Sequence, residues 1–204
     1  EPTLKLLAHE TESPTFRYAL SCMGTTAHHY VAPARREDVL RRVAAELWTL
    51  ANAAEAGSDN QFQLVNAYLG YGEEGDAEFA ANVRGLLDGT VTLDGLDIDN
   101  DMRWALVKAL ASVNQIDEAG IDTELAKRDT TANREFAMGA RASRSTAEAK
   151  EWAWNEAIRN QELTNMQLEA VARGFAGATP ELADPYVERY FAEADWIWTN
   201  RTFH

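Results

Sequence analysis

The chain has one cysteine, few prolines and no long apolar run, and each of these absences excludes a class of protein. The single cysteine, Cys22, cannot form an internal disulfide, which fits a reducing compartment and predicts a cytoplasmic protein. Five prolines and twelve glycines in 204 residues leave room for many uninterrupted helices. No stretch approaches the roughly 20 consecutive apolar residues of a membrane span, and the first residues lack the basic start and apolar run of a signal peptide. We therefore expect no membrane partner, and the absence of an initiating Met fits a piece of a longer polypeptide.

Basic side chains are also scarce in this sequence. There are 19 Lys and Arg against 33 Asp and Glu, which gives a net charge of −14. A nucleic-acid surface needs clustered Lys and Arg to bind phosphates, so nucleic acid is not an expected partner. The acidic balance favours simple solubility, and a partner with a basic surface is the alternative.

Apolar residues recur at the three- and four-residue spacing of amphipathic helices along almost the whole chain. The alternation typical of strands is nearly absent, and only residues 90–98 look extended. Prolines, capping residues and glycines predict where the helices begin and end. In the first half of the chain we expect helices that begin at Pro14, run from Pro33 to Gly57, run from Ser58 or Asp59 to Gly70, and run from Ala77 to Leu87 with Gly89 beyond the end. In the second half we expect a helix that begins at Asp99 or Asn100, helices over about 117–127 and about 131–142, and three more within 146–203.

The predicted fold class is all-α. About eleven helices with short connections are typical of stacked antiparallel helix pairs, so we expect a right-handed α-α superhelix, or HEAT-like solenoid, formed by a single domain over residues 1–204. No internal sequence repeat can be aligned, so the solenoid prediction depends only on the number and regular spacing of the predicted helices.

Two pairs of tryptophans, Trp152 with Trp154 and Trp196 with Trp198, are spaced two residues apart. On a helix this spacing separates the side chains by about 200°, so one member can enter the core while the other needs cover elsewhere. We favour cover by neighbouring helices of the same chain, with an interface to a missing domain or a second copy as the alternative.

Two histidine-containing segments resemble metal sites but depart from them where a ligand is required. The segment HETES at 9–13 has Ser13 where the HExxH motif of zinc peptidases has its second histidine, so we interpret it as a polar turn. His28 and His29 are adjacent, and on a helix they point about 100° apart and do not share one metal. We interpret them as a surface or helix-end pair.

The acidic run that begins at Asp97 imitates the start of a calcium loop, but Met102 replaces the loop's glycine and Lys108 its bidentate glutamate. Aspartates at the start of a helix explain this run better. Nucleotide-binding and nucleophile motifs are absent as well, so we expect neither a catalytic centre nor a metal or cofactor in this chain.

Arg141 and Arg144, with Arg134 earlier on the same predicted helix, form a basic strip in an acidic chain. Arginine clusters can bind the carboxylate of a peptide. Salt bridges to neighbouring helices are the use that we favour.

Several segments resemble the C-terminal helical domain of actinobacterial aminopeptidase N, a family of zinc-dependent gluzincin exopeptidases. LDGLDIDNDMRWAL at 93–106 is similar to the family's LDGLxxDxDxRW segment, and AEAKEWAW, LTNMQLEAVARGF and PYVERYFAEA follow it in order. ANREFAMGARASRSTAEAK resembles the stretch where the family has ARP-T-x-EAK, with Ser145 in place of the proline. The next helix must then be capped by Ser145 or Thr146. The resemblance is strongest over residues 93–203.

The resemblance implies an accessory domain of a zinc aminopeptidase that cleaves N-terminal residues from peptides. Such a domain would close the catalytic chamber and help to admit and orient the peptide substrate, and its partners would be the catalytic and N-terminal domains of the same polypeptide. Zinc is expected in that missing catalytic domain, so we expect this chain alone to be inactive. The candidates for facing the peptide are Arg103, Arg141 and Arg144. The alternatives are a free-standing α-solenoid scaffold that binds other proteins, and a helical enzyme with an unrecognised site.

Overall fold

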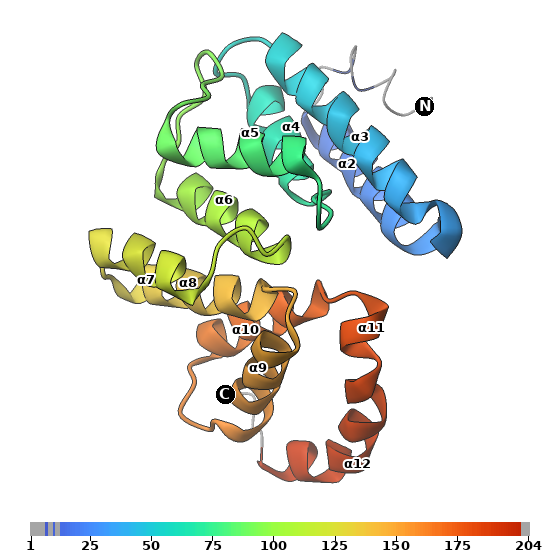
Figure 1. Ribbon diagram of the computed structural model, residues 1–204, viewed down its shortest axis with the longest axis vertical. Helices are drawn as coiled ribbons and strands as arrows, with labels where there is room; N and C mark the ends of the chain where they lie inside the picture. The colour runs from blue at the N-terminus through green and yellow to red at the C-terminus, as the bar shows by residue number, and fades with distance from the viewer. Residues whose placement is uncertain (1–6, 8–9, 11–12, 201–204) are drawn as a thin grey trace. The chain divides into compact units, whose positions relative to one another are not determined.

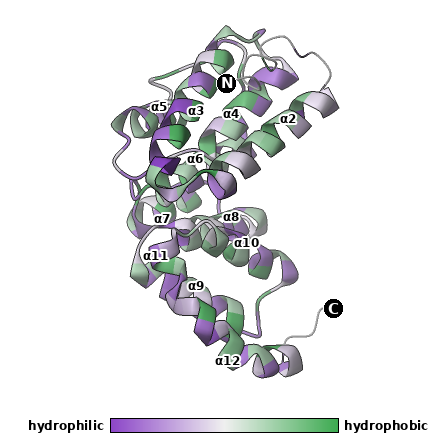
Figure 2. Ribbon diagram, turned by 90° about the vertical axis from the view of Figure 1, so that its right-hand side faces the viewer, coloured by the Kyte–Doolittle hydropathy of each residue, from purple (hydrophilic) through white to green (hydrophobic). Residues whose placement is uncertain are grey.

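The computed structural model describes residues 7, 10 and 13–200, and every regular element within them is a helix, which confirms the all-α prediction (Figure 1). The elements are α2 (Ser13–Thr25), the π-helix η1 (Thr26–Tyr30), α3 (Pro33–Ala53), α4 (Asp59–Leu69), α5 (Ala77–Asp88), α6 (Asn100–Ser112), α7 (Glu118–Lys127), α8 (Thr131–Ser143), α9 (Ala147–Arg159), α10 (Asn165–Ala176), α11 (Pro180–Ala183) and α12 (Pro185–Asn200). Hydrophobic and hydrophilic residues alternate in colour along these helices in Figure 2, as amphipathic helices require.

The chain separates into two compact units, Glu1–Ala109 and Leu110–His204, and α6 runs across the boundary. The first unit contains α2 to α5 with most of α6, and the second contains the end of α6 and the helices that follow. The handedness of a solenoid and the single domain over 1–204 stay predictions.

Helix starts follow the local signals in the sequence. Pro33 occupies the first turn of α3, where its missing N–H costs nothing. The Ser58 side chain caps α4 by accepting the backbone N–H of Gln61. Asp99 accepts the backbone N–H of Met102 at 2.8 Å, which confirms that the acidic run starts a helix.

Glycine directly follows the end of a helix at two of the three positions where we predicted it. Gly70 ends α4, and Gly89 follows α5 in the left-handed conformation with φ 82°. The prediction that Gly57 ends α3 is wrong, because the helix stops at Ala53 and Ala54 is already extended. Gly57 lies instead in the loop before α4.

In the first unit, residues 90–98 form turns rather than a strand, and they pack on the connection between α3 and α4. The buried side chain of Gln61 holds the two segments together, since its Nε2 donates to the carbonyls of Ala51 and Asp94. A Cβ on Gly95 would lie 2.4 Å from the nitrogen of Gly57, so this contact needs glycine on the loop.

In the second unit, α8 and α10 approach each other through glycine. A Cβ on Gly174 of α10 would lie 2.5 Å from the carbonyl oxygen of Gly139 on α8. Beside this crossing, Ala142, Ala153 and Val171 form a fully buried cluster that joins α8, α9 and α10. The small residues let two helix backbones lie close together, so the centre of this unit is tightly packed.

The two tryptophan pairs differ in how they are covered. Trp154 is buried, and Trp152 packs on the cluster around Ala142, so internal packing is confirmed for this pair. Trp196 lies against the Arg159 guanidinium, 4.6 Å from its ring centroid. Trp198 is 87% exposed, so the prediction of internal cover is wrong there: the described residues leave most of this side chain in contact with water.

Candidate functional site

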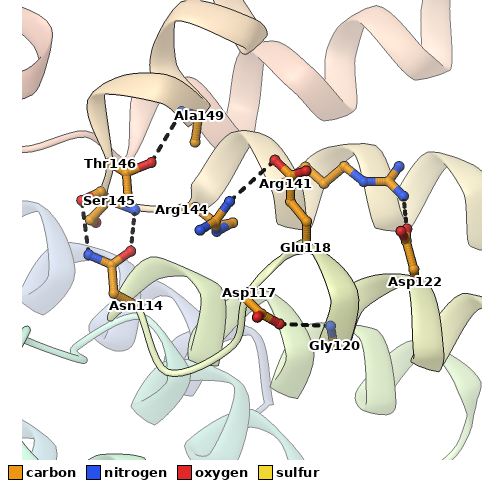
Figure 3. A network of polar contacts seen from close by, with 10 residues as sticks. All are labelled: Asn114, Asp117, Glu118, Gly120, Asp122, Arg141, Arg144, Ser145, Thr146 and Ala149. Carbon is orange, nitrogen blue, oxygen red and sulfur yellow. Dashed lines mark hydrogen bonds and ion pairs between the residues drawn. The ribbon is translucent and has the colours of Figure 1, made fainter.

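The two arginines of the predicted basic strip lie where α7, α8 and α9 meet. Arg141 occupies the last turn of α8, and Arg144 is the residue that ends this helix. Both reach back to α7, where Glu118 and Asp122 share one face because they are four residues apart. Arg141 pairs with Asp122, and Arg144 Nη1 lies 3.3 Å from the Glu118 carboxylate (Figure 3).

The exposure of these four side chains is unequal, and this decides what the pairs can do. The arginine side chains are 25% and 19% exposed, whereas their carboxylate partners are 62% and 64% exposed. Arg144 also keeps a buried Nε without a hydrogen-bond partner. The guanidinium groups are therefore held in place by the fold while the carboxylates face water, and an outside carboxylate could replace a partner without moving the arginine. The favoured salt bridges are confirmed, and contact with a peptide stays a prediction.

The turn behind the arginines is fixed by Asn114 and Ser145. Asn114 has φ 55°, and its side-chain amide makes two bonds to the backbone of Ser145 at 2.9 and 3.1 Å. The Ser145 hydroxyl also donates to the carbonyl of Ser112 at 2.6 Å. A proline at position 145 has neither an N–H nor a hydroxyl group, so it could donate neither of these hydrogen bonds. The serine that stands in place of the family's proline therefore adds two hydrogen bonds to this turn.

Thr146 caps α9 by accepting the backbone N–H of Ala149 at 3.2 Å, as the sequence predicted for Ser145 or Thr146 (Figure 3). Arg144 is the last capping residue of α8 and Thr146 is the first capping residue of α9, so Ser145 alone connects the two helices. The position of Arg144 is therefore set by two helices and by Asn114.

Lys150 is the residue of this region that sequence reasoning did not identify. It is fully buried, and its ammonium donates to the carbonyls of Ala142 at 2.7 Å and Gly174 at 3.3 Å. These carbonyls belong to the last turns of α8 and α10, where the helix dipoles are negative. A signal was available, since position 150 precedes the core residues Ala153 and Trp154 by three and four residues on α9.

The remaining candidates lie elsewhere. Arg103 belongs to the first unit, where its Nη1 donates to the carbonyl of Leu87 at 3.0 Å. Arg134 pairs with Asp129 two turns before Arg141 on α8. The second unit therefore brings Arg141 and Arg144 together, and Arg103 is not part of that pair.

His28 and His29 lie on η1, a rare helix type that often marks function. The His28 ring is 5.2 Å from the Tyr71 ring, and burial, followed by the charge of His29, lowers the pKa of His28. Burial raises the pKa of Tyr71 to about 12. His9 of the HETES segment lies outside the described residues.

Among the described residues, no group of three or more His, Cys, Asp or Glu side chains is arranged to hold a metal ion. In the same part of the chain, none of the helices combines the length and apolarity needed to cross a membrane. The guanidinium groups of Arg141 and Arg144 can recognise an anion by donating hydrogen bonds to it.

The residues that the structure describes form an all-helical fold with a fixed pair of arginines on its surface. A family model for the ERAP1-like C-terminal domain matches residues 2–203, and the chain belongs to this family. The chain is also 36% identical over 174 residues to Aminopeptidase N of Streptomyces lividans. The match covers 85% of this chain and 20% of that relative, so the chain spans about a fifth of the relative's length. The predicted resemblance to a C-terminal aminopeptidase N domain is confirmed.

Proposed function

We propose that the chain works as the accessory C-terminal domain of a zinc aminopeptidase, and that it helps to close the chamber and orient the peptide. The observation that carries the proposal is the family match over residues 2–203 to a C-terminal domain, in a chain that spans 20% of an aminopeptidase relative. The zinc ligands and the general base would lie in the remaining part of such a polypeptide. This chain would supply binding energy remote from the reacting bond.

Within this proposal, Arg141 is the group that meets the far end of the peptide. It is a quarter exposed, and its partner Asp122 is largely solvated. A peptide carboxylate can take the place of Asp122 and form a charge-assisted hydrogen bond in the same geometry. Arg144 is less exposed and is held by the turn at Ser145, so it supports the site from behind.

The test is a pair of variants in the complete enzyme. Arg141→Ala should raise KM for peptides several-fold and leave KM for single aminoacyl amides unchanged, because only the peptide reaches this domain. Asp122→Ala should lower KM for peptides, because it removes the competing carboxylate. Arg134→Ala is the matched control, since Arg134 also lies on α8 and pairs with an aspartate.

The pattern across the variants decides between binding and stability. If Arg141 acts only through its ion pair, Arg141→Ala and Asp122→Ala will change KM in the same direction. Equal changes of KM for peptides and aminoacyl amides would also contradict the distal-end role. Zinc content and turnover of the isolated chain test the accessory role itself, and stoichiometric zinc with chelator-sensitive turnover would refute it.

A further inference from the structure

Helix α12 has an inner face that is held to α9 by polar and aromatic contacts. Arg189 Nη1 lies 2.7 Å from the Glu151 carboxylate, and the Tyr186 hydroxyl donates to the same carboxylate at 3.2 Å. Arg159 of α9 pairs with Glu193 at 2.5 Å. These contacts fix which side of α12 faces the rest of the unit.

The opposite side of α12 carries an apolar stripe that nothing in the described chain covers. Its members follow helical spacing and share one side, and we call them the outer stripe: Val187, Tyr190, Phe191 and Trp198. Their exposed fractions are 52%, 49%, 73% and 87%. Nine large hydrophobic residues are exposed among those described, and four of them lie on this one helix. Such clustering marks an interaction surface, whereas scattered exposed residues do not.

The composition of the outer stripe is that of the centre of a protein interface. Tyr, Trp and Phe are enriched at interface cores and dominate binding energy there. Tyr190 and Phe191 are already in edge-to-face contact, with ring centroids 5.7 Å apart, so they present one continuous aromatic surface.

Charge argues against a second copy of this chain as the occupant. Glu188 and Asp195 are exposed and lie three and four residues from Phe191, so they form an acidic edge along the stripe. Two stripes facing each other would bring these edges together, and each chain carries a net charge of −14. The complementary surface is apolar with a basic rim.

The length of the relative indicates where that surface lies. This chain spans 20% of the aminopeptidase that it matches, so most of such a polypeptide lies outside the family domain. We propose that the outer stripe of α12 docks on an apolar, basic-rimmed surface in that remaining part of the same polypeptide. This inference rests on the proposed function, because it assumes that the chain is joined to an aminopeptidase.

Hydroxyl-radical footprinting of the complete polypeptide and of the isolated 204-residue chain tests the docking. Trp198 and Phe191 should oxidise about tenfold more slowly in the complete, monomeric polypeptide, as expected for side chains in a buried interface core. Met166, which is 58% exposed on α10, is the internal reference. Equal oxidation in both forms would overturn the docking.

Two other outcomes also overturn it. Protection that grows with protein concentration would identify a second copy as the occupant. Protection already present in the isolated chain at low concentration would identify the chain's own first unit. These readouts do not depend on KM, so failed docking can be told apart from a failed distal-end role for Arg141.

A stripe variant adds a functional measurement. Phe191→Ser with Trp198→Ser should leave the melting temperature of the isolated chain unchanged, since both residues are exposed there. In the complete polypeptide the same double variant should lower the melting temperature and speed the proteolytic release of this domain. Met166→Ser should do neither. If the double variant behaves like Met166→Ser in the complete polypeptide, the stripe is not a docking surface.

Discussion

Replacing Gly174 by alanine tests how closely α8 and α10 are packed. The new Cβ would lie 2.5 Å from the Gly139 carbonyl oxygen and 2.7 Å from the Ala142 Cβ. Neither neighbour is the far end of a flexible side chain, so the two helix backbones must separate. The same movement would draw the Gly174 carbonyl away from the Lys150 ammonium, which lies 3.3 Å from it.

The magnitude follows from two opposing terms. Overpacking a rigid core costs about 1–3 kcal/mol, and a contact with backbone belongs at the upper end of that range. Alanine in place of glycine in a helix gains about 0.5–1 kcal/mol. We therefore expect Gly174→Ala to lower the free energy of unfolding by about 2 kcal/mol and the melting temperature by about 4–8 °C in a chain of this length.

Two other glycines provide matched controls, one on α8 and one directly after the end of α10. Gly139→Ala places its Cβ 3.4 Å from the Ala170 carbonyl oxygen, so slight crowding should cancel the gain in helix propensity. Gly177→Ala meets only the Gly174 oxygen at 3.8 Å, and its φ of −79° suits any residue. We expect Gly177→Ala to leave stability unchanged or raise it by up to about 1 kcal/mol.

Urea unfolding of the isolated chain, followed by circular dichroism and by tryptophan fluorescence, measures these differences. The expected order of stability is Gly177→Ala, then Gly139→Ala, then Gly174→Ala. A Gly174→Ala variant as stable as the unsubstituted chain would refute the close packing of α8 and α10. Equal losses at Gly174 and Gly177 would show that loss of glycine, rather than the crossing, is responsible.

Three further predictions concern single side chains. Lys150→Met should lower the free energy of unfolding by about 1–3 kcal/mol in urea titrations, because two carbonyls at helix ends lose a charged hydrogen-bond donor. Unchanged stability would show that Lys150 contributes only through packing. Ser145→Pro should cost about 1–2 kcal/mol through two lost hydrogen bonds. It should cost about half as much in an Asn114→Gly background, where the bond from the Ser145 N–H is already absent and only the hydroxyl bond to Ser112 is lost; equal costs in both backgrounds would contradict the coupling. Burial lowers the pKa of His28 below its ordinary 6.5, so the stability that neutral His28 provides is present above pH 6.5 and is lost as the pH falls through its folded pKa. His28→Gln should therefore flatten the decline in melting temperature between pH 7 and pH 5, and an unchanged slope would show that His28 does not contribute.

The sequence was enough to predict the helices and most of their boundaries. Capping residues such as Ser58 and Thr146 act on backbone groups three residues away, and Gly89 needs only its own backbone freedom. Signals of this kind are local, so they can be read before any packing is known. The error at Gly57 arose because a glycine in a loop and a glycine at a helix end have the same local sequence pattern.

The sequence also placed Arg141 and Arg144 on one strip and predicted that salt bridges would hold them. It could not give their partners, because Glu118 and Asp122 lie on α7, and the sequence does not show how α7 packs on α8. Only the packed helices show which guanidinium groups are held in place and which carboxylates remain solvated.

Three properties were decided by tertiary structure alone. The Lys150 ammonium binds carbonyls 8 and 24 residues away along the chain, so local sequence does not show which groups this lysine binds. The glycine crossing joins α8 to α10, two helices that are not consecutive. Which side of α12 faces outward follows from the contacts of its inner side with Glu151 and Arg159, since both sides of this helix carry aromatic residues. Local sequence determines where a helix forms, but the side that it buries depends on residues that the chain brings together only when it folds.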